Sequence, residues 1–166
     1  MTPRLSASRA IVFGTLVIGI LDGLDAIVFF YLWSGATAPR IFQGVAAGLL
    51  GRAAAGQGGA SAALLGVALH FFVAFGVVTT FVAASRRLEV LTRRPVVSGI
   101  LYGLAVYAVM NYLVIPLSAI GPRTAATPLP VLANGLLIHM FGVGLPAALF
   151  ARAAAPGPRY HFSVSP

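Results

Sequence analysis

Cysteine and lysine are both absent from the chain. Without cysteine there are no disulfides, thiolate metal sites, iron–sulfur clusters or covalently attached c-type haem. Without lysine a retinal cofactor cannot be held through a Schiff base. Only three residues are acidic, so a site that requires many carboxylates is also excluded.

Charge of either sign is scarce. Charged residues make up 8% of the chain and hydrophobic residues 59%, whereas a soluble domain carries about 25% charged residues. The surface exposed to water must therefore be small. The net charge of +8 comes from arginine alone, and on a soluble chain it would favour nucleic-acid binding. Here the arginines flank apolar runs, so we interpret them as topology signals and expect no nucleic-acid partner.

Long apolar runs are what the chain has in abundance. Each of four runs reaches the roughly 20 residues that a helix needs to cross about 30 Å of hydrocarbon. We therefore predict an all-α polytopic membrane protein, with the lipid bilayer around a four-transmembrane-helix bundle in one domain over residues 1–152. The first run offers no suitable cleavage site, so we expect a retained span rather than a signal peptide. The predicted spans are 11–33, 60–85, 96–120 and 129–151.

Arginine counts predict the orientation. With the N terminus in the cytoplasm, inner segments carry eight arginines and outer segments three, so the positive-inside rule predicts cytoplasmic termini. In segment 39–55, the stretch between Arg40 and Arg52 is too short to cross the membrane. We therefore predict an interfacial or re-entrant helix on the outer side, with a fifth crossing as the alternative. Segment 153–166 lacks apolar periodicity and is expected to be a flexible cytosolic tail.

Proline interrupts the last two predicted spans. Pro116 has no amide hydrogen, which frees a carbonyl near Tyr112 and predicts a kink there. Pro146 lies in the last span.

Five polar residues inside the predicted spans form the candidate site. Ionisable side chains at membrane depth cost about 2.5 to 3.5 kcal/mol on insertion scales and usually face a bundle interior or a water cavity. Counted from the outer end of each span, one of the five lies eight residues deep and three lie nine deep, which is about 12 to 14 Å at about 1.5 Å per residue. Those four are Asp25, His70, Asn111 and His139, and Asp22 lies one turn deeper.

Small residues accompany these five positions. Glycine lets helices approach closely, so we predict that each polar side chain lies on a helix-contact face rather than toward lipid. The accompanying residues are Gly19 and Gly23 beside Asp22, Gly66 before His70, Gly103 and Tyr107 before Asn111, and Gly135 and Gly142 around His139.

Several chemistries fit this set of residues. Aspartate and histidine together can exchange protons near neutral pH, and the same groups can ligate a divalent cation. His70 and His139 on different helices could be the axial ligands of a b-type haem. Alternatively, interhelical hydrogen bonds of about 0.6 to 2 kcal/mol each would only hold the bundle together, as in a non-catalytic accessory or scaffold subunit. The sequence assigns no cofactor, and a homo-oligomer or a membrane-complex partner stays open.

Enzyme motifs fail on residue count. The stretch "DGLDA", Asp22 to Ala26, matches the start of the CDP-alcohol phosphotransferase motif. Position 27 is isoleucine rather than arginine and no aspartate follows Asp25, so the two-metal carboxylate set cannot be built. Ser98 and Ser118 lack a nucleophile-turn signature. No catalytic residue is assigned.

Three stretches carry a resemblance to a known family: "GVALHFFVAF", "GILYGLAVYAVMNYLVIPLSA" and "NGLLIHMFGVGLPAALFAR". From about Gly66 to Arg152 the chain resembles the YagU-like family of small bacterial inner-membrane proteins. The resemblance implies a four-helix protein of the bacterial inner membrane and no established reaction. Asp22 and Asp25 lie outside it.

Overall fold

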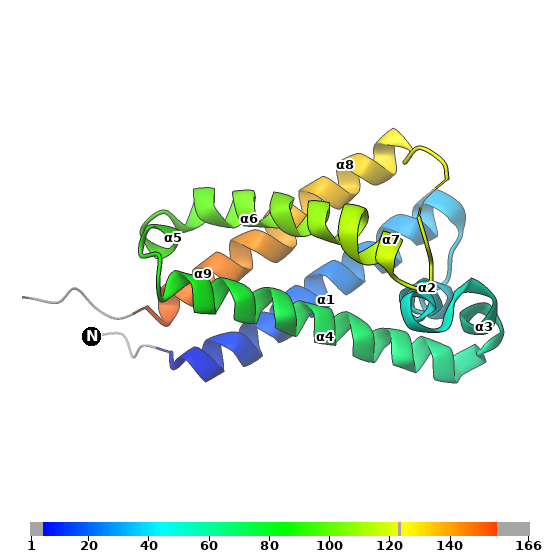
Figure 1. Cartoon of the computed structure of the whole chain (residues 1–166), viewed down its shortest axis with the longest axis horizontal. Helices are drawn as coiled ribbons and strands as arrows, with labels where there is room; N and C mark the ends of the chain where they lie inside the picture. The colour runs from blue at the N-terminus through cyan, green and yellow to red at the C-terminus, as the bar shows by residue number, and fades with distance from the viewer. Residues whose placement is uncertain (1–4, 123, 156–166) are drawn as a thin grey trace, which may run out of the picture.

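The computed structural model of the chain, shown in Figure 1, describes residues 5–122 and 124–155. Helices make up most of these residues, and the described ranges contain no strand. The all-α prediction is therefore confirmed. The predicted tail at 153–166 lies outside the described residues from position 156 onward.

Four helical segments in the described part of the chain are long and apolar enough to cross a membrane. Their lengths of 23 to 28 residues correspond to about 35 to 42 Å at about 1.5 Å per residue, which exceeds the roughly 30 Å of a hydrocarbon core. This confirms the predicted four-span membrane fold. The four segments are α1 (Ala7–Ser34), α4 (Gly59–Ser85), Pro95–Leu117 and Leu129–Ala153.

The third and fourth spans each contain a π-helical segment shortly before a proline. Proline has no amide hydrogen and its ring clashes with the carbonyl four residues earlier, so we attribute the wider π turn to this clash. The predicted kink near Tyr112 thus corresponds to a π-helical turn that includes Tyr112. The third span consists of α6 (Pro95–Val109), η1 (Met110–Val114) and α7 (Ile115–Leu117), and the fourth of α8 (Leu129–Leu137), η2 (Ile138–Gly144) and α9 (Leu145–Ala153).

The segment between the first two spans folds as two short helices. They are α2 (Ala38–Leu50) and α3 (Arg52–Gln57), and Gly51 separates them with a φ of 79°. In Figure 1, α2 is seen almost end-on while the long helices lie lengthwise, so its axis is transverse to theirs. It lies near the start of α4 and the end of α7. Its 13 residues reach only about 20 Å, which is too short to cross the hydrocarbon core.

Both ends of the described chain lie at the opposite end of the bundle from α2 (Figure 1). The backbone N–H of Leu5 donates to the carbonyl of Ala153 at 3.2 Å, and this hydrogen bond joins the two ends of the described chain. The short helix α5 (Val90–Arg93) lies at this end as well.

The described arginines are divided unequally between the two ends of the bundle. Arg9, Arg86, Arg87, Arg93, Arg94 and Arg152 lie at the end with the termini, and Arg40 and Arg52 lie at the other.

Glycine contacts set the spacing between the third and fourth spans. A Cβ on Gly103 of α6 would meet the backbone of His139 and Met140, with the Met140 Cα only 2.7 Å away. A Cβ on Gly144 of η2 would meet the backbone of Gly99 and Gly103. The two backbones therefore touch directly, and this contact holds the η2 segment that carries His139 against α6.

Candidate functional site

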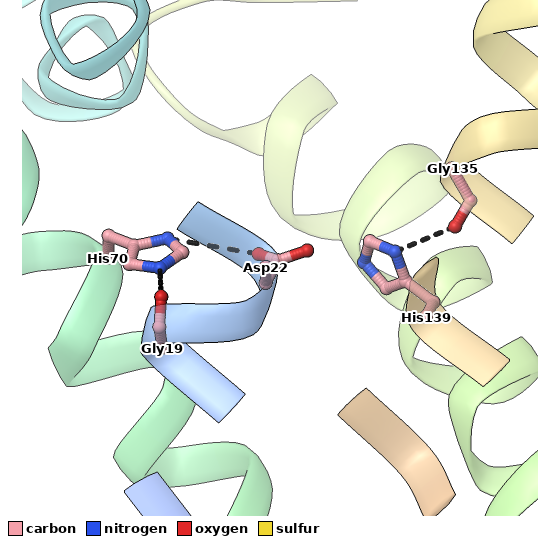
Figure 2. A network of polar contacts seen from close by, with 5 residues as sticks. All are labelled: Gly19, Asp22, His70, Gly135 and His139. Carbon is pink, nitrogen blue, oxygen red and sulfur yellow. Dashed lines mark hydrogen bonds and ion pairs between the residues drawn. The ribbon is translucent and has the colours of Figure 1, made fainter. Parts of the chain in front are cut away.

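His70 of α4 is held between a backbone carbonyl and a carboxylate of α1 (Figure 2). Its Nε2 lies 2.8 Å from the carbonyl oxygen of Gly19. Because a carbonyl only accepts hydrogen bonds, Nε2 carries the proton and donates it. The other ring nitrogen, Nδ1, therefore faces the Oδ2 of Asp22 at 3.9 Å. The side chains of His70 and Asp22 retain 13% and 28% of their exposure, so both are partly open to their surroundings.

Two glycines of α1 create the space for this histidine. A Cβ on Gly23 would lie 3.4 Å from Nε2 of His70, and a Cβ on Gly19 would overlap the ring of Phe71. The rings of Phe42 and Phe71 pack edge-on against the imidazole, with centroids 5.9 and 5.5 Å away. These contacts confirm that Gly19 and Gly23 lie on a helix-contact face.

Asp25 binds Asn134, a residue that is not among the five predicted from the sequence. Its Oδ2 accepts a hydrogen bond from Nδ2 of Asn134 at 2.8 Å, which joins α1 to α8. Asp25 also interacts electrostatically with Asp22 and His139. A signal for Asn134 was present, because it is a carboxamide inside the apolar run 129–151, and the rule that selected Asn111 applies to it equally.

His139 lies in the π-helical segment η2. Its Nδ1 is 2.8 Å from the carbonyl oxygen of Gly135, so Nδ1 donates and Nε2 is the nitrogen that can accept a proton. The ring of Tyr107 packs edge-on at 5.4 Å, and a Cβ on Gly135 would meet that same ring. In Figure 2 His139 and His70 are drawn on opposite sides of Asp22.

Nδ2 of Asn111 donates to the carbonyl of Tyr107 at 3.0 Å, which is a bond within its own span like that of His139 to Gly135. Asn111 lies six residues from Leu117, the end of its span, whereas Asp25 lies nine residues from Ser34 and His139 ten from Leu129. Asn111 is therefore closer to the end of its helix than Asp25 and His139 are to the ends of theirs.

The contacts of Asp22, Asp25 and His70 thus join three spans, and the charge of His139 acts on Asp25. With the newly found Asn134 they form the set that we call the polar cluster: Asp22, Asp25, His70, Asn134 and His139. The prediction that Asn111 belongs to the same layer stays a prediction.

The donor geometry argues against two of the chemistries considered for these residues. Within residues 5–122 and 124–155, no three or more His, Cys, Asp or Glu side chains are placed to hold a metal ion together. For a bis-histidine haem, each imidazole must offer one nitrogen to the iron. His70 directs Nε2 at Gly19 and Nδ1 at Asp22, so iron would have to displace one of these contacts. A haem held between His70 and His139 would therefore require Asp22 to move away from Nδ1 of His70.

The class of the protein follows from the fold and the cluster. The chain is an all-α polytopic membrane protein with a group of aspartate, histidine and asparagine side chains at the depth of its spans. Comparison with protein-family models, with curated proteins and with solved structures gave no match.

Proposed function

We propose that the protein handles protons within the membrane through the polar cluster. The observation that carries this proposal is the placement of His70, whose Nε2–H donates to Gly19 while Nδ1 faces the carboxylate of Asp22 at 3.9 Å. A proton taken up at Nδ1 produces an imidazolium next to its counter-ion. Histidine serves as a proton shuttle in proteins, so this pair is suited to take up and release a proton.

The remaining members of the cluster offer a path for the proton across the bundle. Asp22 and Asp25 are three residues apart on α1, and side chains with that spacing share a helix face. Asp25 interacts electrostatically with His139 of the fourth span. Protons would pass from His70 on α4, through the two carboxylates of α1, to Nε2 of His139. An isolated charge at membrane depth is costly, and pairs of opposite charge reduce that cost.

A cation is the second cargo that the two carboxylates of α1 could bind. Protons are favoured because both histidines have one nitrogen held as a donor and the other left as the acceptor. A cation site would instead need several oxygen ligands around one point.

An accessory or scaffold subunit is the competing function. The observation in its favour is that the bond between Asp25 and Asn134 and the bond between His70 and Gly19 each join two spans. Such bonds hold a bundle together whether or not protons move. In that case the wild-type protein would conduct no protons of its own.

Proton flux into liposomes separates these functions. We expect liposomes with reconstituted wild-type protein to lose an imposed pH gradient faster than empty liposomes do. The internal pH is followed with an entrapped dye, and potassium with valinomycin is present to balance the charge. Asp22→Asn should lower the rate about tenfold or more, because loss of a proton-transferring group typically costs a factor of about 100 or more. Glu89→Gln is the matched control, since Glu89 is exposed and paired with Arg93 outside the spans. Equal rates for wild type and Asp22→Asn would refute the proposal.

We further propose a place in the bacterial inner membrane with both termini in the cytoplasm, as the YagU-like resemblance and the positive-inside rule indicate. The division of arginines between the two ends of the bundle supports this orientation.

The absence of cysteine makes this orientation simple to test. Single cysteines at the exposed positions Ser8 and Thr37 report on opposite ends of α1. A membrane-impermeant maleimide added to intact cells should label Thr37→Cys and not Ser8→Cys. The reverse pattern would invert the proposed topology.

A further inference from the structure

Two phenylalanine rings enclose the imidazole of His70, one on each side of it along the bundle. Both contact the imidazole edge-on, at centroid distances that are ordinary for packed rings. A Cβ on Gly19 of α1 would overlap the ring of Phe71, and a Cβ on Gly23 would lie 3.8 Å from Cζ of Phe42. Gly23 is one turn nearer than Gly19 to the end of the bundle that carries α2. Phe42 therefore covers the imidazole toward the α2 end, and Phe71 covers it toward the end with the termini.

A backbone contact between α2 and α4 holds Phe42 in this place. A Cβ on Gly66 of α4 would overlap the backbone carbonyl of Phe42, so the two helices touch directly there. Gly66 lies seven residues into α4 and one turn before His70, which is about 10 Å from the start of α4. Phe42 thus extends from the backbone of α4 to Gly23 of α1, and its ring bridges the gap between these two helices beside His70.

The polar cluster is not closed equally toward the two ends of the bundle. Toward the termini, the buried core continues beyond Phe71 with Ile18 of α1 and Ala74 of α4, each about one turn from the cluster, and with further buried residues of α4 and α9. Toward the other end, α2 packs mainly against α4 and has few contacts with α1. The tip of Phe42 is therefore a thin closure between α1 and α4.

We propose that the ring of Phe42 closes the polar cluster toward the α2 end of the bundle, and that protons reach His70 from that end when the ring moves aside. The proton in this statement rests on the proposed function, whereas the closure itself can be measured without it. Phe42 has no group that binds a proton, so its role is to control access to Nδ1 of His70 and to the carboxylate of Asp22 beside it.

The reactivity of a single thiol beside His70 measures this access. The chain has no cysteine, and Asp22→Cys places one thiol next to the imidazole. Intact cells and inverted membrane vesicles are treated with a membrane-impermeant methanethiosulfonate, and Thr37→Cys and Ser8→Cys show which preparation exposes which end of α1. We expect Asp22→Cys to react slowly from both sides. Adding Phe42→Ala should raise the rate from the α2 side about tenfold, which corresponds to about 1.4 kcal/mol. The rate from the other side should not change, because the core there is intact.

Phe71→Ala is the matched control. It removes the same kind of edge-on ring from the same imidazole but leaves α2 in place, so the rate from the α2 side should stay at the value for Asp22→Cys alone. Phe72→Ala removes a ring that is 71% exposed and should change neither rate. Phe42→Leu keeps an apolar side chain that ends before the position of Cζ. It should give a smaller increase from the α2 side, and it keeps the test valid if Phe42→Ala does not fold.

An unchanged rate from the α2 side in both Phe42→Ala and Phe42→Leu would overturn the proposal. An equal increase in Phe71→Ala would do so too, because it would show a general loosening around His70. Proton flux in liposomes is read separately. If the wild type conducts no protons but Phe42→Ala exposes the thiol, the closure stands and the proposed function fails. If the wild type conducts protons and the thiol stays protected, the proposed function stands and the closure by Phe42 fails.

Discussion

Replacing Gly103 by alanine should strongly destabilise the bundle. The new Cβ would overlap the carbonyl of His139 and lie 2.7 Å from the Cα of Met140. All of these neighbours are backbone atoms of η2, which cannot rotate away as a flexible side chain can. The two helices must therefore separate by several tenths of an ångström or more.

The magnitude follows from overpacking. Extra methylene groups in a packed core typically cost about 1 to 3 kcal/mol, and a gap of about 0.5 to 1 Å loses a quarter to a half of the dispersion energy of each separated contact. We expect about 3 kcal/mol for Gly103→Ala, at the upper end because the obstacle is backbone.

Gly76→Ala on α4 is the matched control. A Cβ there meets no atom within 4 Å, so the gain in helix propensity of up to about 1 kcal/mol is the main effect. The free energy of unfolding of both variants can be measured by SDS titration in mixed micelles, followed by circular dichroism. Unfolding of Gly103→Ala and Gly76→Ala at the same SDS fraction would show that the backbone contact at Gly103 does not limit the stability of the bundle.

Other consequences of the geometry can be measured separately. Asn134→Leu removes the hydrogen-bond donor to Asp25 and should lower the free energy of unfolding by about 1 to 3 kcal/mol. The double variant Asn134→Leu with Asp25→Asn should lose less stability than the sum of the two single variants. Strictly additive losses would contradict the hydrogen bond between Asp25 and Asn134. Purified protein incubated with hemin should show no shifted Soret band, since both nitrogens of His70 are directed at α1; a bis-histidine spectrum would contradict that assignment. Glu89→Gln should change the free energy of unfolding by less than about 0.5 kcal/mol, because the exposed ion pair between Glu89 and Arg93 is screened by solvent. A larger loss would show that α5 depends on this ion pair.

The sequence was sufficient for the spans because bilayer thickness fixes their length. Four apolar runs predicted four spans, and the structure confirms them with ends shifted by a few residues. The short helix over 39–55 was predicted because the segment between Arg40 and Arg52 is too short to cross the membrane. Its division at Gly51 was not, because several glycines lie in that segment and the sequence does not say which of them takes a positive φ.

The sequence predicted a shared depth for the candidate site, but it could not predict the contacts of the site. Counting residues along each span gives only a height within the membrane. Which face a side chain occupies depends on helix phase, and the π-helical segments before Pro116 and Pro146 change that phase in the two spans that carry Asn111 and His139. The link from Asp25 to Asn134 joins residues 109 positions apart, and nothing in the local pattern could pair them.

The glycine pattern was the more informative signal. Gly19 and Gly23 were predicted to mark a contact face on α1, and they pack against Phe71 and His70. Small residues beside a polar residue thus indicate where a neighbouring helix approaches, although they do not reveal which helix it is.

The most direct test of the proposed function is a double-mutant cycle on proton flux. Asp25→Asn and His70→Ala are reconstituted singly and together, and the rate of gradient collapse is compared with wild type and with empty liposomes. If the polar cluster acts as one unit, each single variant is already slow and the double variant falls to the rate of empty liposomes with no further additive loss. A double variant that conducts protons at the wild-type rate would contradict the account.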